Sequence, residues 1–255
     1  MVKAQMEEKS IESRAAAVRE RMAESAARAG RKGSEIKLMA VTKTRTVAEM
    51  LTAAPFVDAL GENRVQEAAS KKEVWEKEVK EKEVKEKEVW ADSSKLEWHL
   101  IGHLQRNKVR KALALFDALD SLDSVELALA AERTAAEEGR TVPVLIEVNT
   151  SGEENKTGIH VENFPELLDG VLGCAHLKLE GFMTVGPLTD DETRVRSAFA
   201  QLREMASQAR LRSGLPVPVL SMGMSEDFHW AILEGSTCVR IGTFLFGPRA
   251  GKGGF

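Results

Sequence analysis

The chain has 255 residues, with 36 lysines and arginines against 40 aspartates and glutamates, a net charge of −4 at pH 7. It has no basic block, which argues against nucleic acid as the main partner. Its two cysteines, Cys174 and Cys238, lie far apart and in no metal-binding spacing, so we expect neither a disulfide framework nor a zinc site. No apolar run approaches the ~18 residues of a membrane span, and no secretory signal is visible, so we expect a cytoplasmic protein without membrane contact.

The apolar residues alternate between helical and strand-like periods along the chain. Ile11, Ala15, Val18 and Met22 follow helical spacing in a lead helix that ends near Gly30. Strands are expected at 36–43, 58–62, 96–101, 118–122, 142–148, 177–185, 217–222 and 237–246. Helices are expected at 5–29, 46–54, 102–116, 124–139, 164–172, 191–212 and 226–234.

Such alternation is typical of parallel strands joined by crossover helices. A doubly wound open sheet would give a similar pattern. The count of eight strands and a length near the ~250 residues of barrel domains favour a closed (β/α)8 TIM barrel with an extra N-terminal helix. No linker or change of composition divides the chain, so we expect one domain over residues 1–255.

Residues 71–90 form a five-residue near-repeat, KKEVW EKEVK EKEVK EKEVW. A step of five residues advances a helix by about 500°, so the valines spread around the axis and form no stripe. Glutamates lie four residues before lysines, and each such pair adds about 0.2–0.5 kcal/mol to helix stability. We interpret the segment as a solvated helical elaboration. The alternative is a docking arm for a partner, anchored by Trp75 and Trp90.

Lys43 ends the first expected strand, and active sites of barrels form at the carboxyl ends of the strands. A lysine that is desolvated, or close to another cation, has a lowered pKa, so its free amine can attack an aldehyde. The simpler interpretation is a lysine at a strand end that reaches solvent.

Two apolar runs near the C-terminus end in small and hydroxyl residues, at 221–225 and 242–243. Glycine permits close approach to the backbone, and hydroxyls with free amides at a helix start bind a phosphate dianion. The last two strands of a barrel are a frequent place for a phosphate. We call residues 221–225 and 242–243 the expected phosphate cup. A lysine opposite this cup indicates a phosphorylated aldehyde held as a Schiff base.

The same segment has two competing interpretations. A serine-hydrolase elbow is excluded, because GMSED lacks the closing glycine of G-x-S-x-G. Ser225 is also expected to cap a helix that begins at Glu226, and the simplest alternative is that it does only this.

Arg240 lies inside an apolar strand, between Val239 and Ile241. A buried arginine is costly unless it is paired, so it needs a carboxylate, a phosphate or a ring nitrogen. A structural ion pair is an equal alternative. His99 and His103 have H-x-x-x-H spacing without the glutamate of a zincin, so we assign no metal.

Six motifs resemble the pyridoxal phosphate homeostasis proteins, in the right order over residues 35–248. They are AVTK at 40–43, GENRVQE at 61–67, WHLIGHLQRNK at 98–108, GFMT at 181–184, LSMGMS at 220–225 and VRIGT at 239–243. The resemblance implies a single barrel of the alanine-racemase-like fold (fold type III), without that enzyme's second β domain. The five-residue repeat lies between two motifs and is a local departure from the pattern.

The resemblance also implies a cofactor and its ligands. Lys43 would form the internal aldimine with pyridoxal 5′-phosphate (PLP). Arg240 would face the pyridine nitrogen, and Asn63 would line the cofactor pocket. The phosphate would be held around Ser221, Met224, Ser225, Gly242 and Thr243.

We predict a carrier without catalytic residues. Racemases of this fold use a lysine on one face of the substrate and a tyrosine on the other, and this chain has no tyrosine. An arginine against the pyridine nitrogen leaves that nitrogen unprotonated, which weakens the ring as an electron sink. The protein would hold PLP, release it to PLP-dependent apoenzymes and take part in control of vitamin B6; we expect a monomer.

Three other functions stay open. The first is a weak PLP-dependent racemase, or a decarboxylase-like enzyme, with a cysteine or histidine as its second acid/base. The second is a sugar-phosphate aldolase that acts through a Schiff base. The third is a scaffold that docks partners through residues 71–90.

Overall fold

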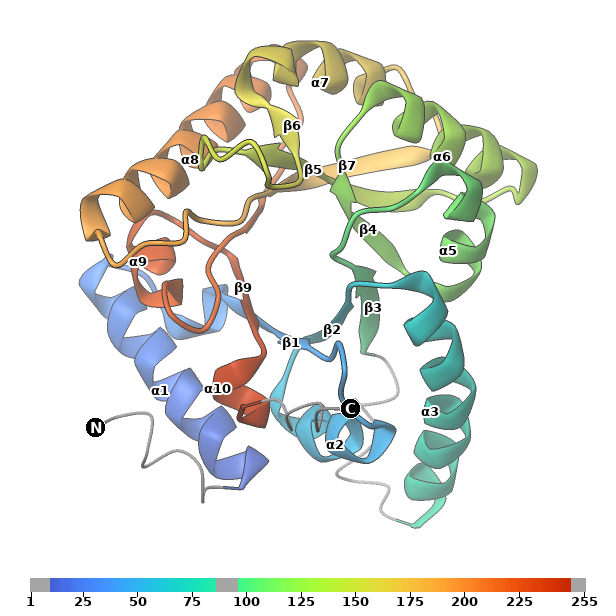
Figure 1. Cartoon of the computed structure of the whole chain (residues 1–255), viewed down its shortest axis with the longest axis vertical. Coiled ribbons are helices and arrows are strands. Elements are labelled where there is room, and N and C mark those ends of the chain that lie inside the picture. Colours follow the sequence, from blue (N-terminus) through green and yellow to red (C-terminus); the bar gives the residue numbers. More distant parts are fainter. Residues whose placement is uncertain (1–9, 86–95, 249–255) are drawn as a thin grey trace, which may run out of the picture.

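Eight parallel strands close into a barrel in the computed structural model, which describes residues 10–85 and 96–248 (Figure 1). Within these residues the barrel strands are β1 (Lys37–Val41), β2 (Ala59–Glu62), β3 (Glu97–Leu100), β4 (Ala118–Leu122), β5 (Val142–Asn149), β7 (Leu177–Met183), β8 (Val219–Ser221) and β9 (Cys238–Ile241). Pairing of β4 with β5 and of β1 with β9 closes the ring. The predicted (β/α)8 barrel is confirmed, and the open doubly wound sheet is excluded.

The helices form an outer ring around the strands (Figure 1). In the described residues they are α1 (Ile11–Arg28), α2 (Val47–Ala53), α3 (Val65–Lys85), α5 (Val109–Leu115), α6 (Val125–Glu137), α7 (Phe164–Leu172), α8 (Glu192–Ser213), α9 (Phe228–Leu233) and α10 (Thr243–Phe246). The predicted lead helix is α1, which packs against α9 and α10. None of the helices described is both long enough and apolar enough for a bilayer crossing.

The N-terminal cap of α2 follows from the sequence pattern. Thr46 caps α2 through a capping box with Glu49, as its position before the helix predicts.

Most buried apolar residues lie between strands and helices, whereas Met39, Ala59 and Cys238 form a separate cluster of strand residues. Side chains that fill the interior in this way make a barrel of this size a packed core.

The last predicted strand, at 237–246, is wrong in its second half. β9 ends at Ile241, and residues 243–246 form the short helix α10. Both halves are apolar, and a short apolar run does not distinguish a buried strand from a buried helix. The sequence also missed β6 (Ile159–His160), which pairs with the end of β5.

Two predicted helix starts also lie elsewhere. The helix expected from residue 102 begins with a 3-10 turn at Arg106–Lys108 and becomes α5 at Val109. The helix expected from Glu226 begins at Phe228, with Asp227 in the N-cap position. Ser225 therefore does not cap it, and that prediction is wrong.

The solvated interpretation of the charged repeat is wrong for the part that the structure describes. Trp75 and Val79 of α3 are both only 4% exposed, and Trp75 meets the ring of Trp98 edge-on at 5.9 Å. A docking arm that uses Trp75 is excluded by the same burial. Trp90 and the end of the repeat lie outside the described residues.

Candidate functional site

A cavity of about 220 Å³ lies at the carboxyl ends of β1, β8 and β9. Its lining includes six of the eight site residues predicted from sequence: Lys43, Met224, Ser225, Arg240, Gly242 and Thr243. Pairing of β1 with β9, with Ala40 opposite Ile241, brings the first and last of these segments together. This is the end of the barrel at which active sites form.

Lys43 lies in a loop, because β1 ends two residues earlier at Val41. The sequence placed it at the strand end. Its side chain is half-buried and lines the cavity. The next residue, Thr44, has a φ of 64°, a left-handed conformation that is costly for a β-branched residue.

Arg240 carries a buried positive charge on the cavity wall and is only 3% exposed. Its guanidinium donates to Ser221 Oγ and to the carbonyl oxygen of Thr184, both at 2.8 Å. No carboxylate of the described residues lies within 4.0 Å of it, so the alternative of a structural ion pair is not seen there. Burial lowers the pKa of Arg240, with partial compensation by more distant acidic groups.

The turn between β8 and α9 is built around a glycine. Gly223 has a φ of 98°, and a Cβ there would lie 2.6 Å from the Cβ of Ala231. The amide of Met224 donates to Asp227 Oδ1 at 2.6 Å, so that amide is already satisfied. Burial raises the pKa of Asp227, although this hydrogen bond opposes the change.

Ser225 joins the two segments of the expected phosphate cup. Its Oγ accepts a hydrogen bond from the amide of Phe244 at 3.2 Å, which ties the β8 turn to α10. A hydroxyl also has one proton to donate, and this bond leaves that proton unused. Ser225 therefore has a donor for a ligand in the cavity, which it also lines.

A second cavity, of about 200 Å³, lies at the opposite end of the barrel. His99 lies there, with Nδ1 2.8 Å from Asp120 Oδ1 and Nε2 3.5 Å from Glu97 Oε2. Burial alone would lower the pKa of His99, but the two carboxylates outweigh it and raise the pKa to about 10. The charges at this end compensate one another, whereas Arg240 at the other end has no such partner among the described residues.

Comparison with known proteins identifies the family. Residues 14–250 match the family model described as alanine racemase, N-terminal domain. A pyridoxal phosphate homeostasis protein of Aquifex aeolicus is 38% identical over 235 residues, which are 91% of this chain and 95% of that protein. The chain belongs to the pyridoxal phosphate homeostasis protein family.

Solved structures agree with this family assignment. An unknown protein from Bifidobacterium adolescentis is 35% identical with a TM-score of 0.82, and the match covers 92% of this chain and 94% of that one. PipY of Synechococcus elongatus with PLP bound is 31% identical with a TM-score of 0.70, over 89% of this chain and 100% of that one. Alanine racemase of Corynebacterium glutamicum is 16% identical with a TM-score of 0.64, over 94% of this chain and 63% of that one, which shows the fold alone.

Two of the predicted site residues of this family member do not line the cavity. Ser221 is fully buried and accepts the hydrogen bond from Arg240, so it orients the guanidinium from behind. Asn63 is half-buried directly after β2, and its Oδ1 has no hydrogen-bond partner although it is buried. The role of Asn63 at the cofactor stays a prediction.

The structure adds residues to the cavity that sequence reasoning missed. Arg45 and Glu226 line it, and Arg45 also donates to the carbonyl oxygen of Gly247 at 2.5 Å. The close spacing of Arg45 to Lys43 was the available signal for a second cation. Thr184, the last residue of the GFMT motif, accepts a hydrogen bond from Arg240 at its carbonyl oxygen, a role that the motif alone does not indicate. The described residues contain no group of three metal-binding side chains.

Proposed function

We propose that this chain binds PLP in the cavity at the carboxyl ends of β1, β8 and β9 and takes part in PLP homeostasis as a carrier. The observation that carries the proposal is Arg240, a buried cation without a carboxylate partner among the described residues, on the wall that Lys43 also lines. A cation of this kind favours a cavity that receives an electron-rich or anionic ligand. The PLP bound to PipY, a relative, supports the same ligand.

The residues of the cavity fit the functional groups of PLP. Lys43 supplies a primary amine, which condenses with an aldehyde with loss of one water. The hydroxyls of Ser225 and Thr243 provide polar groups for a phosphate, and Met224 and Gly242 line the same part of the cavity, although the Met224 amide is already bonded to Asp227. Arg240, oriented by Ser221, is assigned to the pyridine nitrogen, and Asn63 to the edge of the site.

The absence of turnover is the finer part of the proposal. PLP supplies an electrophilic aldehyde and a ring that withdraws electrons. In this chain Arg240 does not transfer a proton to the ring nitrogen, because a guanidinium remains charged in proteins. The sequence has no tyrosine to move a proton on the second face of a substrate. We therefore assign Lys43 to holding and releasing the aldehyde.

Reduction with borohydride tests the assignment of Lys43. We expect a pyridoxyl group on Lys43 in the peptide map of the reduced, PLP-loaded protein. Lys43→Ala should lose the visible absorbance band of bound PLP, whereas Lys156→Ala, which removes a lysine outside the cavity lining, should retain it. A label on another lysine would overturn the assignment.

Proton exchange separates a carrier from a weak racemase. The PLP-loaded protein is incubated with each enantiomer of an amino acid in D2O, and deuterium at the α-carbon is followed by NMR. We expect exchange no faster than with free PLP at the same concentration. Rapid exchange, lost in Lys43→Ala, would establish an enzyme and end the carrier proposal.

A further inference from the structure

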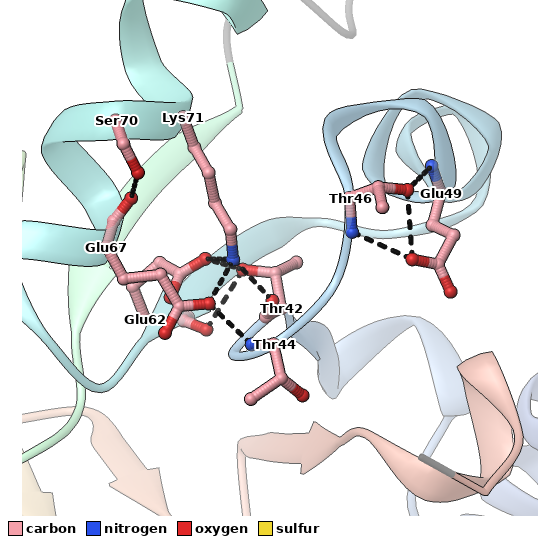
Figure 2. Close-up of polar contacts among 9 residues, drawn as sticks. Thr42, Thr44, Thr46, Glu49, Glu62, Glu67, Ser70 and Lys71 are labelled. Atoms are coloured by element: carbon pink, nitrogen blue, oxygen red, sulfur yellow. Dashed lines mark hydrogen bonds and ion pairs between the residues drawn. The ribbon is translucent and has the colours of Figure 1, made fainter. Parts of the chain in front are cut away.

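The loop that carries Lys43 is held on both sides by one cluster of buried and half-buried charges (Figure 2). Lys71 of α3 donates to Glu62 Oε1 at 2.7 Å, to Glu67 Oε1 at 2.6 Å and to the carbonyl oxygen of Thr42 at 2.8 Å. An ammonium has three protons, so all of its donors are used. We name Glu62, Glu67 and Lys71 the Lys71 cluster.

Each neighbour of Lys43 in sequence is bonded to this cluster. Before it, Thr42 donates its hydroxyl to Glu62 Oε1 at 2.7 Å, and its carbonyl accepts from Lys71. After it, the amide of Thr44 donates to Glu67 Oε1 at 2.5 Å. The backbone on both sides of Lys43 is therefore tied to α3, although the Lys43 side chain lines the cavity instead.

The contact at Thr44 holds a strained conformation. Its φ of 64° is left-handed, and a non-glycine residue adopts such a conformation persistently only where its surroundings impose it. A turn over residues 42–45 calls for this conformation, because the amide of Arg45 donates to the carbonyl oxygen of Thr42 at 2.9 Å, and Glu67 helps to hold it by accepting the Thr44 amide. Strain of this kind gathers at ligand sites, where it fixes a geometry that the chain would not choose alone.

The charges of the cluster are not arranged for stability alone. Two carboxylates share one ammonium, and Glu62 is fully buried with Oε2 lacking a hydrogen-bond partner. Burial raises the pKa of Glu62 despite its bonds to Lys71 and Thr42. A buried ionic group is weak evidence for stability, because desolvation offsets most of the attraction. The hydrogen bonds of the cluster with the loop indicate a role in fixing its geometry.

We propose that the Lys71 cluster positions Lys43 for covalent capture of the aldehyde, with Glu67 acting through Thr44. The inference rests on the proposed function of Lys43. It makes Glu62, Glu67 and Lys71 positioning residues, since their hydrogen bonds are with the loop and with one another.

Glu67→Ala tests this inference with two ligands. PLP binds through both the amine and the remaining contacts, whereas pyridoxine 5′-phosphate has no aldehyde and does not bond to Lys43. We expect Glu67→Ala to weaken PLP binding by about tenfold, the scale of one left-handed residue released from its constraint, and to leave pyridoxine 5′-phosphate binding unchanged. Visible absorbance and fluorescence titrations measure the two dissociation constants.

A matched control comes from the other end of the barrel. Glu132 of α6 also accepts backbone amides from a loop, those of Ala175 at 3.1 Å and His176 at 2.8 Å. Those residues precede β7, so they lie at the end of the barrel opposite the cavity that Lys43 lines. Glu132→Ala removes the same kind of contact and should leave the ratio of the two dissociation constants at its wild-type value.

A second substitution separates positioning from loss of structure. Asparagine enters the left-handed region more readily than threonine, and Thr44 is exposed, so the side chain has room. Thr44→Asn in the Glu67→Ala background should recover most of the lost PLP affinity. A merely structural role for Glu67 would not produce this recovery.

The outcomes distinguish this inference from the proposed function. If borohydride labels Lys43 but Glu67→Ala weakens both ligands equally, or weakens neither, the positioning role is wrong and the carrier proposal stands. The same conclusion follows if Thr44→Asn restores nothing. If Lys43 is not labelled, the proposed function fails first, whatever Glu67→Ala does.

Discussion

Two buried ionisable side chains, Glu147 on β5 and Arg240 on β9, influence one another without forming an ion pair in the described part of the chain. Glu147 is 2% exposed, and only one of its oxygens has a partner, the hydroxyl of Thr157 at 2.5 Å. Burial raises its pKa from 4.5 to about 7, although the Thr157 hydrogen bond and the Arg240 charge oppose the change. The carboxyl group of Glu147 therefore takes up a proton close to neutral pH.

Glu147 gives the fold a pH dependence of known sign. Between pH 4.5 and about 7 the folded state keeps a proton that the unfolded state has lost, so the free energy of unfolding falls as pH rises. The free energy of unfolding falls by about 3 kcal/mol over this range. Glu147→Gln should remove this contribution and flatten the profile.

Urea unfolding of the cofactor-free protein at pH 5 and pH 8 measures the effect. The control is Glu166→Gln, which changes an exposed glutamate of α7 and should leave the profile as in the wild type. An unchanged profile in Glu147→Gln would contradict the raised pKa.

At the scale of one element, α3 has a buried face that does not follow its five-residue sequence repeat. Val65, Ala68, Lys71, Trp75 and Val79 are all buried, at successive steps of three or four residues. This spacing is that of one helical face. The five-residue step of the valines does not follow this face, because Val79 belongs to it whereas Val74 is 46% exposed.

The two faces of α3 predict opposite results for neighbouring substitutions. Trp75→Ala should lower the free energy of unfolding by about 3–5 kcal/mol, since it removes a large buried ring that packs on Trp98. Val74→Ala, one residue earlier, should change it by no more than about 0.5 kcal/mol. Chemical denaturation of both variants checks the difference. Equal effects would restore the solvated interpretation of this segment.

At the scale of the whole molecule, closure of the barrel assembles the site. Each barrel strand of the described residues pairs with neighbours on both sides, so the ring has no open edge. The cavity takes its lining from both ends of the sequence, Val41 to Arg45 and Met224 to Thr243. A ligand in this cavity binds a surface that the unfolded chain lacks.

Ligand binding should therefore raise the thermal midpoint of the protein. At a free PLP concentration about 100 times its dissociation constant, the folded state gains about 2.7 kcal/mol. For a chain of this length we expect a shift of several degrees in differential scanning calorimetry, much reduced in Lys43→Ala. Pyridoxal without the phosphate should shift the midpoint less than PLP at equal concentration. Equal shifts would argue against the phosphate contacts.

Sequence reasoning reached local features more readily than contacts between distant segments. Three local features depend on neighbours in sequence, and the structure has each of them. They are the helical spacing of apolar residues in α1, the cap at Thr46 and the apolar run of β5. The distinction between β9 and α10 was missed, because both are short and apolar. The partner of Ser225, the amide of Phe244, lies 19 residues away and has no local signature.

The sequence by itself determined the eight strands of the barrel, although not β6, and the residues with chemistry to offer, because periodicity and residue type are local properties. Only the tertiary structure decided which of these meet. Pairing of the first strand with the last puts Lys43 and Arg240 on one cavity. Lys71 of α3 donates to the carbonyl oxygen of Thr42, in the loop that follows β1. Burial and the satisfaction of polar groups depend on which distant segments become neighbours, and the fold sets that.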